Sequence, residues 1–286
     1  MENIVPKFWE NIAKGLNDKA YPDYYSMNGV RLKIVLDILS QHTKGKLLDA
    51  GCGAGHTTRI FLERGWDAVG IDFSAAMVNE SRIHLQKKGF SKDFINQAFI
   101  TDLSIFQDSY FDIVVCLGVL YYVKQDDLAY KEIYRVLKPN GVFISSYQNE
   151  LFDLFTFNSY TRRFFRNHIF PLVDSGDNGI KKDLENSLYN LITNPDEPIR
   201  HDDGSARGIL FTRPENPLTF NKKLSKYNFH ITSEPYYHGI HLMPPLIEKQ
   251  YPELKKMGEH KQYDLRNDWR SLFMAAHFLI EARKNG

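Results

Sequence analysis

The feature that most constrains the fold is the segment KLLDAGCGAGH at residues 46–56. A short apolar run leads into an aspartate, and glycine then occupies three alternate positions, Gly51, Gly53 and Gly55. Glycine costs backbone entropy on folding, so several glycines directly after a strand indicate positive φ angles or a main chain that a ligand approaches closely. The segment therefore predicts a strand, a tight turn and a helix that together bind a nucleotide-like ligand.

Short apolar runs alternate with helical patterns from this point to about residue 148. Helices are predicted at about 55–64, 74–88 and 125–138, and strands at about 67–72, 96–102, 111–119 and 142–148. The run FDIVVCLGV at 111–119 is apolar almost throughout, which is typical of a central strand buried on both faces. This alternation predicts an α/β fold with a mostly parallel sheet covered by helices on both faces.

The alternation is interrupted between residues 149 and 215. This stretch is first rich in aromatic residues and arginine and then rich in turn formers, so we expect a lid that contacts the substrate. The alternation resumes with a helix at 217–229, a strand at 229–237 and a long last strand at 271–283. We expect one domain over 1–286, with an N-terminal helical cap at 1–45 and an active-site loop at 238–268.

The neighbours of the glycines narrow the class of ligand. A dinucleotide fingerprint, GxGxxG, needs a third glycine at position 56, where this chain has His56. Asp72 closes the second predicted strand, where an acidic side chain can accept both hydroxyls of a ribose. The third strand is predicted to end at Thr101-Asp102-Leu103. Asp49, Asp72 and Asp102 would then share the carboxyl edge of the sheet, which is the ligand-binding edge of such folds.

These motifs resemble those of class I S-adenosylmethionine-dependent methyltransferases. The resemblance rests on LLDAGCGAG, VGIDFSAAMV, ITDL, FDIVVCLGVLYYV and EIYRVLKPNGVFISS, and it covers residues 40–148, with a weaker likeness of element order over 210–283. The family implies a doubly wound, mostly parallel seven-stranded sheet. Its last strand is antiparallel and lies between the fifth and sixth strands, and here a helical lid insertion would separate strands five and six.

The resemblance also implies a cofactor, S-adenosyl-L-methionine, with S-adenosyl-L-homocysteine as the product. In the family, the glycine turn holds the methionine end, the acid after the second strand binds the ribose, and residues after the second and third strands frame the adenine. The N-terminal tyrosines of AYPDYYSMNG would close over the site. The implied cofactor-binding residues are Asp49, Gly51, Cys52, Gly53, Gly55, Asp72, Phe73, Met77, Asp102, Leu103, Leu117 and Tyr21.

The acceptor side is less stereotyped than the cofactor side. Methyl transfer from a sulfonium depends mostly on alignment, and a general base adds more when the acceptor carries a proton. Histidine suits proton transfer near neutral pH, and two histidines lie close together in YYHGIHLMPP. The catalytic candidates are His238, His241 and Tyr25. The substrate candidates are Tyr121 and Tyr122, which would line the pocket, and Arg162, Arg166 and His168, which either clamp an anionic group or form the wet face of a lid helix.

Composition excludes some functions. The formal net charge is +1, which does not favour a nucleic-acid partner, and position 116–119 reads CLGV where nucleic-acid amino-methyltransferases carry an Asn/Asp-Pro-Pro-aromatic motif. Cys52 and Cys116 lack metal-ligand spacing, so no metal site is expected. No apolar run approaches the roughly 18 residues that span a bilayer, and no secretory signal is visible. We expect a soluble cytoplasmic protein without stable membrane insertion.

The function predicted from the sequence is methyl transfer to an oxygen or nitrogen of a small-molecule or sugar-type acceptor, and a homodimer is considered as its assembly. Two alternatives remain. The protein could bind S-adenosylmethionine as a non-catalytic sensor, since a fold alone does not prove an activity. It could also be a nicotinamide-dependent oxidoreductase, although His56 and the expected antiparallel last strand argue against that class.

Overall fold

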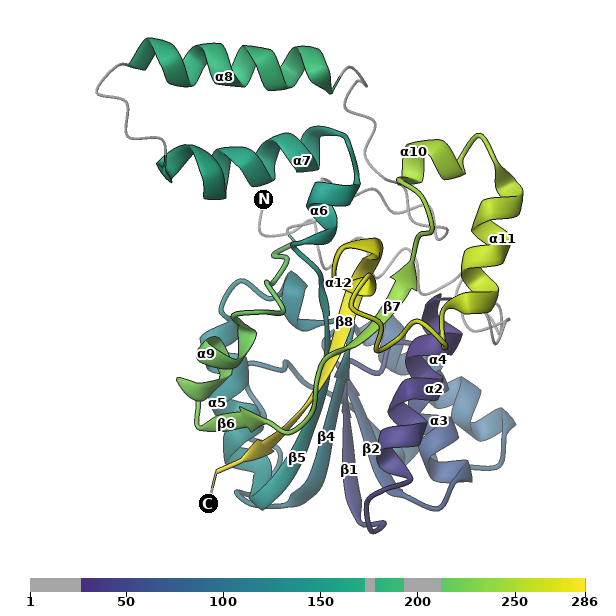
Figure 1. Cartoon of the computed structure of the whole chain (residues 1–286). Coiled ribbons are helices and arrows are strands. Elements are labelled where there is room, and N and C mark those ends of the chain that lie inside the picture. Colours follow the sequence, from purple (N-terminus) through teal and green to yellow (C-terminus); the bar gives the residue numbers. More distant parts are fainter. Residues whose placement is uncertain (1–26, 173–177, 193–211, 286) are drawn as a thin grey trace.

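The computed structural model describes residues 27–172, 178–192 and 212–285, and these residues build one sheet of eight strands (Figure 1). The strand order is β3-β2-β1-β4-β5-β8-β6, and β7 also pairs with β8. β1 to β5 are parallel, whereas β8 runs antiparallel to β5, β6 and β7. The strands are β1 (Lys46–Ala50), β2 (Asp67–Asp72), β3 (Ile95–Gln97), β4 (Phe111–Leu117), β5 (Leu137–Gln148), β6 (Phe229–Ile231), β7 (Tyr236–Ile240) and β8 (Ala275–Lys284).

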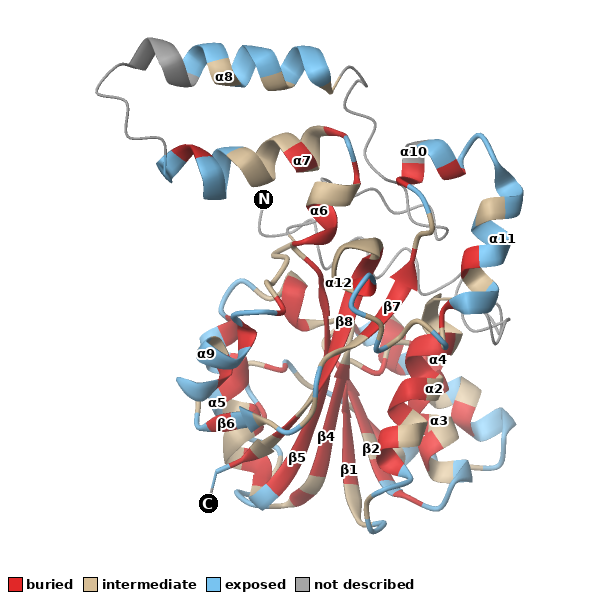
Figure 2. Ribbon diagram, viewed as in Figure 1, coloured by how far each residue is buried: buried red, intermediate tan, exposed pale blue. Residues whose placement is uncertain are grey.

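Helices cover both faces of this sheet, and Figure 2 shows the strands buried between them. The α-helices are α2 (Met27–Leu39), α3 (His56–Glu63), α4 (Ala75–Lys87), α5 (Asp126–Val136), α6 (Phe152–Phe155), α7 (Ser159–Phe164), α8 (Asn178–Leu191), α9 (Phe220–Ser225), α10 (Pro245–Glu248), α11 (Pro252–Lys261) and α12 (Ser271–Met274). Shorter turns are η2 (Lys92–Phe94), η3 (Leu120–Tyr122), η4 (Phe165–Ile169), which is a π-helical turn, and η5 (Phe170–Leu172).

Two apolar cores explain why the central strands are apolar on both sides. On one face, α5 and α9 pack on β4, β5 and β8 through residues such as Tyr130 and Phe220. On the other face, α2 packs on the same three strands through residues such as Ile34 and Val35. Alternate residues of a strand point to opposite faces, so a strand covered on both sides must be apolar at nearly every position. The expected α/β fold is therefore confirmed, with β8 inserted between β5 and β6 as the resemblance implied.

The number of strands differs from the expected seven. The single strand predicted at 229–237 is two strands, β6 and β7, and both pair with β8. Pro235 lies between them and has no N–H to donate to a ladder, so the pairing is interrupted there and resumes at Tyr236. The predicted active-site loop at 238–268 consequently begins inside β7, and it contains the two helices α10 and α11.

The end of the third strand is also different. β3 stops at Gln97, so the prediction that Thr101-Asp102-Leu103 ends a strand was wrong. The amide of Ala98 donates to the Asp72 carbonyl at 3.1 Å, and the chain then turns so that the Asp102 amide donates to Phe99 at 3.0 Å. Ile100 and Leu103 are buried under this turn. For this reason the apolar pattern that resembles a strand continues past Gln97.

The insertion after β5 leaves and re-enters the sheet at one point. The Glu215 amide donates to the Gln148 carbonyl at 2.9 Å, and the Glu150 amide donates to the Glu215 carbonyl at 3.0 Å. Within this insertion α7 and α8 lie side by side beyond the carboxyl edge of the sheet (Figure 1), and most described residues of α8 are exposed (Figure 2). This placement fits the predicted lid at 149–215, whose role stays a prediction.

Candidate cofactor and acceptor site

The glycine turn between β1 and α3 has the backbone that the sequence predicted. Gly51, Gly53 and Gly55 have φ angles of 82°, 53° and 81°. A Cβ on Gly51 would lie 2.2 Å from a methyl group of Val119, and a Cβ on Gly55 would lie 2.5 Å from the Ser81 hydroxyl. A Cβ on Gly53 would meet no atom within 4 Å. Gly51 and Gly55 are thus required by packing, whereas Gly53 presents bare main chain to open space that a ligand can fill.

Asp72 holds this turn in place from the end of β2. Its side chain is buried, and its two carboxylate oxygens accept the Gly53 amide at 3.1 Å and the Ser74 amide at 2.9 Å. Burial raises the pKa of Asp72, and these amide hydrogen bonds partly offset the rise. A carboxylate oxygen can accept two hydrogen bonds, so Asp72 keeps acceptor capacity for ribose hydroxyls. Ser74 also caps α4 by accepting the amide of Met77, which is buried.

Asp49 acts within the protein. Its carboxylate accepts the Thr57 hydroxyl at 2.5 Å and the Thr58 hydroxyl at 2.6 Å, which ties β1 to the first turn of α3. Burial raises the pKa of Asp49 from 3.8 to about 6, although the two hydroxyls oppose the shift. Asp49 therefore positions the glycine turn. Cys52 is buried in the same turn, where burial raises the pKa of its thiol.

Asp49 gives a testable pH dependence. Because its pKa is higher in the folded protein than its ordinary value of 3.8, the stability it contributes is present below about pH 4 and is lost as the pH rises through about 6, a difference of about 3 kcal/mol. Asparagine does not titrate and can still accept both threonine hydroxyls on one oxygen. We expect urea unfolding to show Asp49→Asn gaining stability over the wild type between pH 4 and 7. A difference that stays constant with pH would contradict the assignment.

Two phenylalanines form a flat apolar surface on the β2–β3 side of the turn. The Phe73 and Phe99 rings are stacked with centroids 6.1 Å apart, and Phe99 is 59% exposed. Such a surface suits a purine ring. Asp102 lies three residues after Phe99. Hydrogen bonds from the Ser104 side chain and from the Ser104 amide lower the pKa of Asp102. Leu103 is fully buried.

Arg31 on α2 was not predicted from the sequence. It is 7% exposed, donates to the Asn28 side chain at 3.0 Å, and approaches Gly118, where an added Cβ would lie 3.0 Å from its Nη1. Within the described ranges no carboxylate forms an ion pair with Arg31, and its Nε has no hydrogen-bond partner. A buried cation without a counter-charge is costly, so an anionic group of a ligand is expected here. Leu117 ends β4 beside it, and the Gly118 amide donates to Ser146 at 2.9 Å.

The tyrosines after β4 lie next to this arginine. A Cβ on Gly118 would lie 3.3 Å from the Tyr121 hydroxyl, and the Tyr121 ring packs on Tyr122 at 4.5 Å. Tyr121 also lies 6.2 Å from the ring of His277 on β8. The structure thus places both predicted substrate tyrosines at the carboxyl end of β4, beside the glycine turn.

The lid residues predicted for substrate binding lie farther out and engage other parts of the insertion. Arg162 stacks over the Tyr189 ring at 4.7 Å, Arg166 pairs with Glu185 at 3.1 Å, and His168 pairs with Glu150 at 2.8 Å. The first two contacts join α7 and η4 to α8. These partners favour the wet-face interpretation of the arginine cluster over an anion clamp.

The two histidine candidates have different surroundings. His238 is fully buried in β7, stacked on His277 with centroids 5.3 Å apart, and burial together with Arg31 lowers its pKa well below the usual value. His241 lies just beyond β7, and its side chain is 30% exposed. Its Nδ1 bonds Glu248 at 2.7 Å, and its ring stacks on Phe152 of α6 at 5.2 Å. His241 therefore has the geometry of an oriented proton acceptor. Tyr21 and Tyr25 lie outside the described residues.

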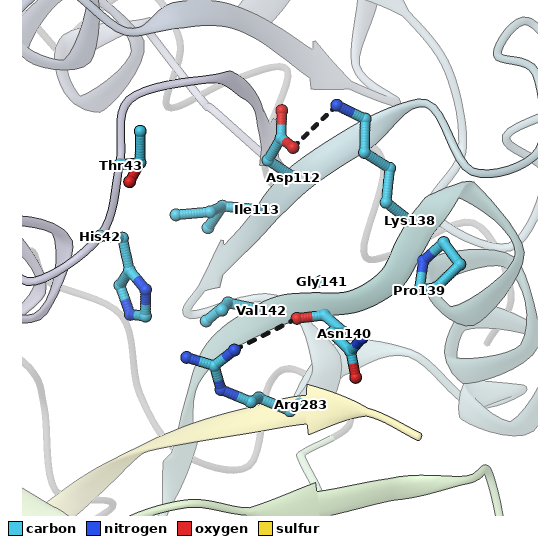
Figure 3. A pocket seen from close by; sticks show the side chains of 10 residues that line it. All are labelled: His42, Thr43, Asp112, Ile113, Lys138, Pro139, Asn140, Gly141, Val142 and Arg283. Carbon is cyan, nitrogen blue, oxygen red and sulfur yellow. Dashed lines mark hydrogen bonds and ion pairs between the residues drawn. The ribbon is translucent and has the colours of Figure 1, made fainter. Parts of the chain in front are cut away.

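A separate cavity of about 190 Å³ lies at the opposite, amino end of the strands (Figure 3). Lys138 pairs with Asp112 there at 2.7 Å, and Arg283 reaches the Asn140 carbonyl. Across the part of the chain that the structure describes, no helix is long and apolar enough to cross a membrane. The same residues contain no group of three or more histidine, cysteine or acidic side chains arranged to hold a metal ion.

Comparisons with known proteins agree with this geometry. Residues 48–145 match the model of the methyltransferase domain family. The chain is 26% identical over 160 residues to the ubiquinone biosynthesis O-methyltransferase of Histophilus somni, covering 53% of this chain and 67% of that protein. It is 31% identical over 134 residues to the protein of the same name from Idiomarina loihiensis, covering 45% and 53%. The chain thus spans about half to two thirds of the length of these curated relatives.

Solved structures share the fold. A SAM-dependent methyltransferase from Methanosarcina mazei superposes with a TM-score of 0.54 at 17% identity, covering 87% of this chain and 97% of that one. The Haloferax volcanii methyltransferase solved with the Trm112 activator gives 0.57 at 14%, covering 97% and 98%. The sheet and its glycine turn define a Rossmann-like fold. More narrowly, residues 48–145 resemble the methyltransferase domain family, and a structure that shares the fold is named as a SAM-dependent methyltransferase.

Proposed function

We propose that this protein transfers a methyl group from S-adenosylmethionine to an oxygen or nitrogen atom of a small-molecule or sugar-type acceptor. The observation that carries the proposal is the open space over Gly53, whose amide is bonded by the Asp72 carboxylate. At the end of β4 the buried Arg31 adds a cation that forms no ion pair with a carboxylate of the described residues. Each feature matches one part of this cofactor: the chain that lies along the turn, the ribose, and the carboxylate of the amino-acid end.

The protein's contribution is mainly to bind and align. The main chain of Gly51–Gly55 would hold the amino-acid portion, Asp72 the ribose, Phe73 and Phe99 the adenine, and Arg31 the carboxylate. The bound cofactor supplies an electrophilic methyl group with a good leaving group. Holding the acceptor in line with that group can contribute about 7–11 kcal/mol in favourable cases. Tyr121, at the end of β4, lines the side on which the acceptor would enter.

Among the three catalytic candidates we propose His241 as the proton acceptor. Within the described residues its Nε2 forms no hydrogen bond, while Nδ1 is engaged by Glu248, so the neutral ring would carry its proton on Nδ1 and offer Nε2 as a base. Burial pushes the pKa of Glu248 up, but the hydrogen bond from His241 and the loop amides of Leu242 and Met243 outweigh burial and hold it below its usual value. An ionised Glu248 stabilises the imidazolium that forms when Nε2 takes the acceptor proton.

A binding and turnover experiment tests the proposal. Calorimetry with S-adenosylhomocysteine should show one site per chain and no binding of NAD. Incubation with methyl-labelled S-adenosylmethionine and pooled small metabolites and nucleotide sugars should transfer label to an acceptor. Binding without any transfer would favour a non-catalytic sensor of S-adenosylmethionine. Binding of NAD in place of S-adenosylhomocysteine would favour the oxidoreductase.

A further inference from the structure

A row of buried polar side chains crosses the carboxyl end of three adjacent strands. Gln148 on β5 pairs directly with His277 on β8, and His277 pairs directly with His238 on β7. Residues directly opposite in an antiparallel ladder point to the same face, and the stacked rings of His238 and His277 agree with this. All three side chains are 2% exposed or less. Polar groups so deeply buried are normally hydrogen-bonded.

Two members of this row are not satisfied. The Oε1 of Gln148 and both ring nitrogens of His238 have no hydrogen-bond partner among the described residues. Gln262, at the end of α11, is also buried, yet it accepts the amides of Gly239 and Ile240 and donates to the Ile240 carbonyl. The same region thus contains one fully bonded carboxamide and one that is left open. Orphaned atoms of this kind indicate a missing partner.

The row adjoins the cofactor side of the site. His277 lies between the two orphaned residues, 6.2 Å from the Tyr121 ring, and Tyr121 in turn flanks Gly118 at the end of β4. Arg31 acts electrostatically on His238, which places its charge near the far end of the row. Met27, at the start of α2, also lies close to His277. A Cβ added to Gly239 would be 3.2 Å from the Met27 sulfur and 3.4 Å from Nδ1 of His277. The row therefore lies between the start of α2 and the carboxyl end of β4. We call its three residues, Gln148, His277 and His238, the seam.

We propose that this seam recognises the acceptor, and that the acceptor is a neutral, hydroxyl-rich compound such as a sugar ring. The inference rests on the proposed function and narrows its acceptor. Gln148 Oε1 requires a donor, while the neutral imidazole of His238 offers one donor and one acceptor. A hydroxyl group both donates and accepts, so neighbouring hydroxyls can satisfy both side chains. A carboxylate or phosphate cannot donate to Gln148, and Arg31 would repel an ammonium group.

Stability measurements test whether the orphaned atoms await a ligand. Removing a buried polar group that has no partner removes its desolvation cost, so Gln148→Leu and His238→Phe should melt at the same temperature as the wild type or higher. The matched control is Gln262→Leu, which breaks three hydrogen bonds and should melt clearly lower. If Gln148→Leu and His238→Phe lose as much stability as the control, these side chains are structural and the inference fails.

Binding measurements test the ligand class. Methyl glycosides of common hexoses serve as neutral probes, and benzoate and aminohexane as charged ones. Saturation-transfer NMR is recorded on protein loaded with S-adenosylhomocysteine. We expect a glycoside to bind the wild type and to bind both apolar variants at least tenfold more weakly, with unchanged affinity for the homocysteine product. Binding of a charged probe alone, or of no glycoside, overturns the inference while the product affinity still upholds the cofactor site. If the wild type does not bind S-adenosylhomocysteine at all, the proposed function itself is contradicted.

Discussion

Gly53→Ala is expected to fold normally and to bind S-adenosylhomocysteine about 10- to 100-fold more weakly than the wild type, a loss of about 1.4–2.8 kcal/mol. The added methyl group would meet no protein atom within 4 Å, so the protein itself has room for it. It would project into the space where we propose that the cofactor lies against the main chain. The left-handed φ of 53° adds a strain of about 1–2 kcal/mol, well within what a stable domain tolerates. Isothermal calorimetry measures the first effect and thermal unfolding the second.

Gly55→Ala is the matched control for this prediction. Gly55 has a similar left-handed φ, 81°, but its added Cβ would lie 2.5 Å from the Ser81 hydroxyl and 3.2 Å from the Ser81 Cα. α3 and α4 would have to separate, so this variant should lose more stability than Gly53→Ala. Unchanged affinity for S-adenosylhomocysteine in Gly53→Ala would show that the space over Gly53 is not the cofactor site. Equal destabilisation of the two variants would show that packing requires Gly53 as well.

Most of the sheet could be predicted because its signals are local. β4 is apolar at almost every position and is followed by a helix that ends where β5 begins, so its place in the centre follows from its own residues. The two errors arose where tertiary contacts decide the outcome. β3 ends at Gln97 because the chain turns there, although burial continues to Leu103. The strand predicted at 229–237 is interrupted at Pro235, and its two pieces, β6 and β7, both pair with the long strand β8.

The candidate site likewise has one part that the local sequence predicts and one part that only the fold brings together. The glycine turn and Asp72 lie within 22 residues of each other, and their roles follow from one strand–turn–helix unit. Arg31, Glu248 and Gln148 come from α2, α10 and β5, and no spacing in the sequence relates them. Nothing in the composition of the segment around Glu248 distinguishes it from a surface acid. Only the fold shows that it is buried and bonded to His241.

His241→Ala is expected to lower kcat by about 10²–10⁴ while leaving the affinity for S-adenosylhomocysteine unchanged, as is usual when a positioned proton acceptor is removed. The affinity should persist because His241 follows β7, whereas the glycine turn follows β1 and Asp72 is the last residue of β2. The measurement uses the labelled-cofactor assay on the acceptor found in the pooled screen. Full turnover in His241→Ala would remove this residue from the mechanism.

Glu248→Gln tests whether Glu248 only orients the His241 ring or also stabilises its positive charge during the reaction. Glutamine keeps the size of the side chain but removes the charge that stabilises the imidazolium, so kcat should fall about tenfold, which is about 1.4 kcal/mol and typical of one charge-assisted hydrogen bond. The affinity for S-adenosylhomocysteine should stay unchanged, because Glu248 bonds His241 and the loop after β7 and not the glycine turn. Of the elements packed on His241, α12 carries no ionisable side chain, and on α6 the Asp153 carboxylate is paired with Arg163 at 2.6 Å. Glu248 is therefore the carboxylate that supports the His241 ring, and an unchanged kcat in Glu248→Gln would assign Glu248 to structure alone.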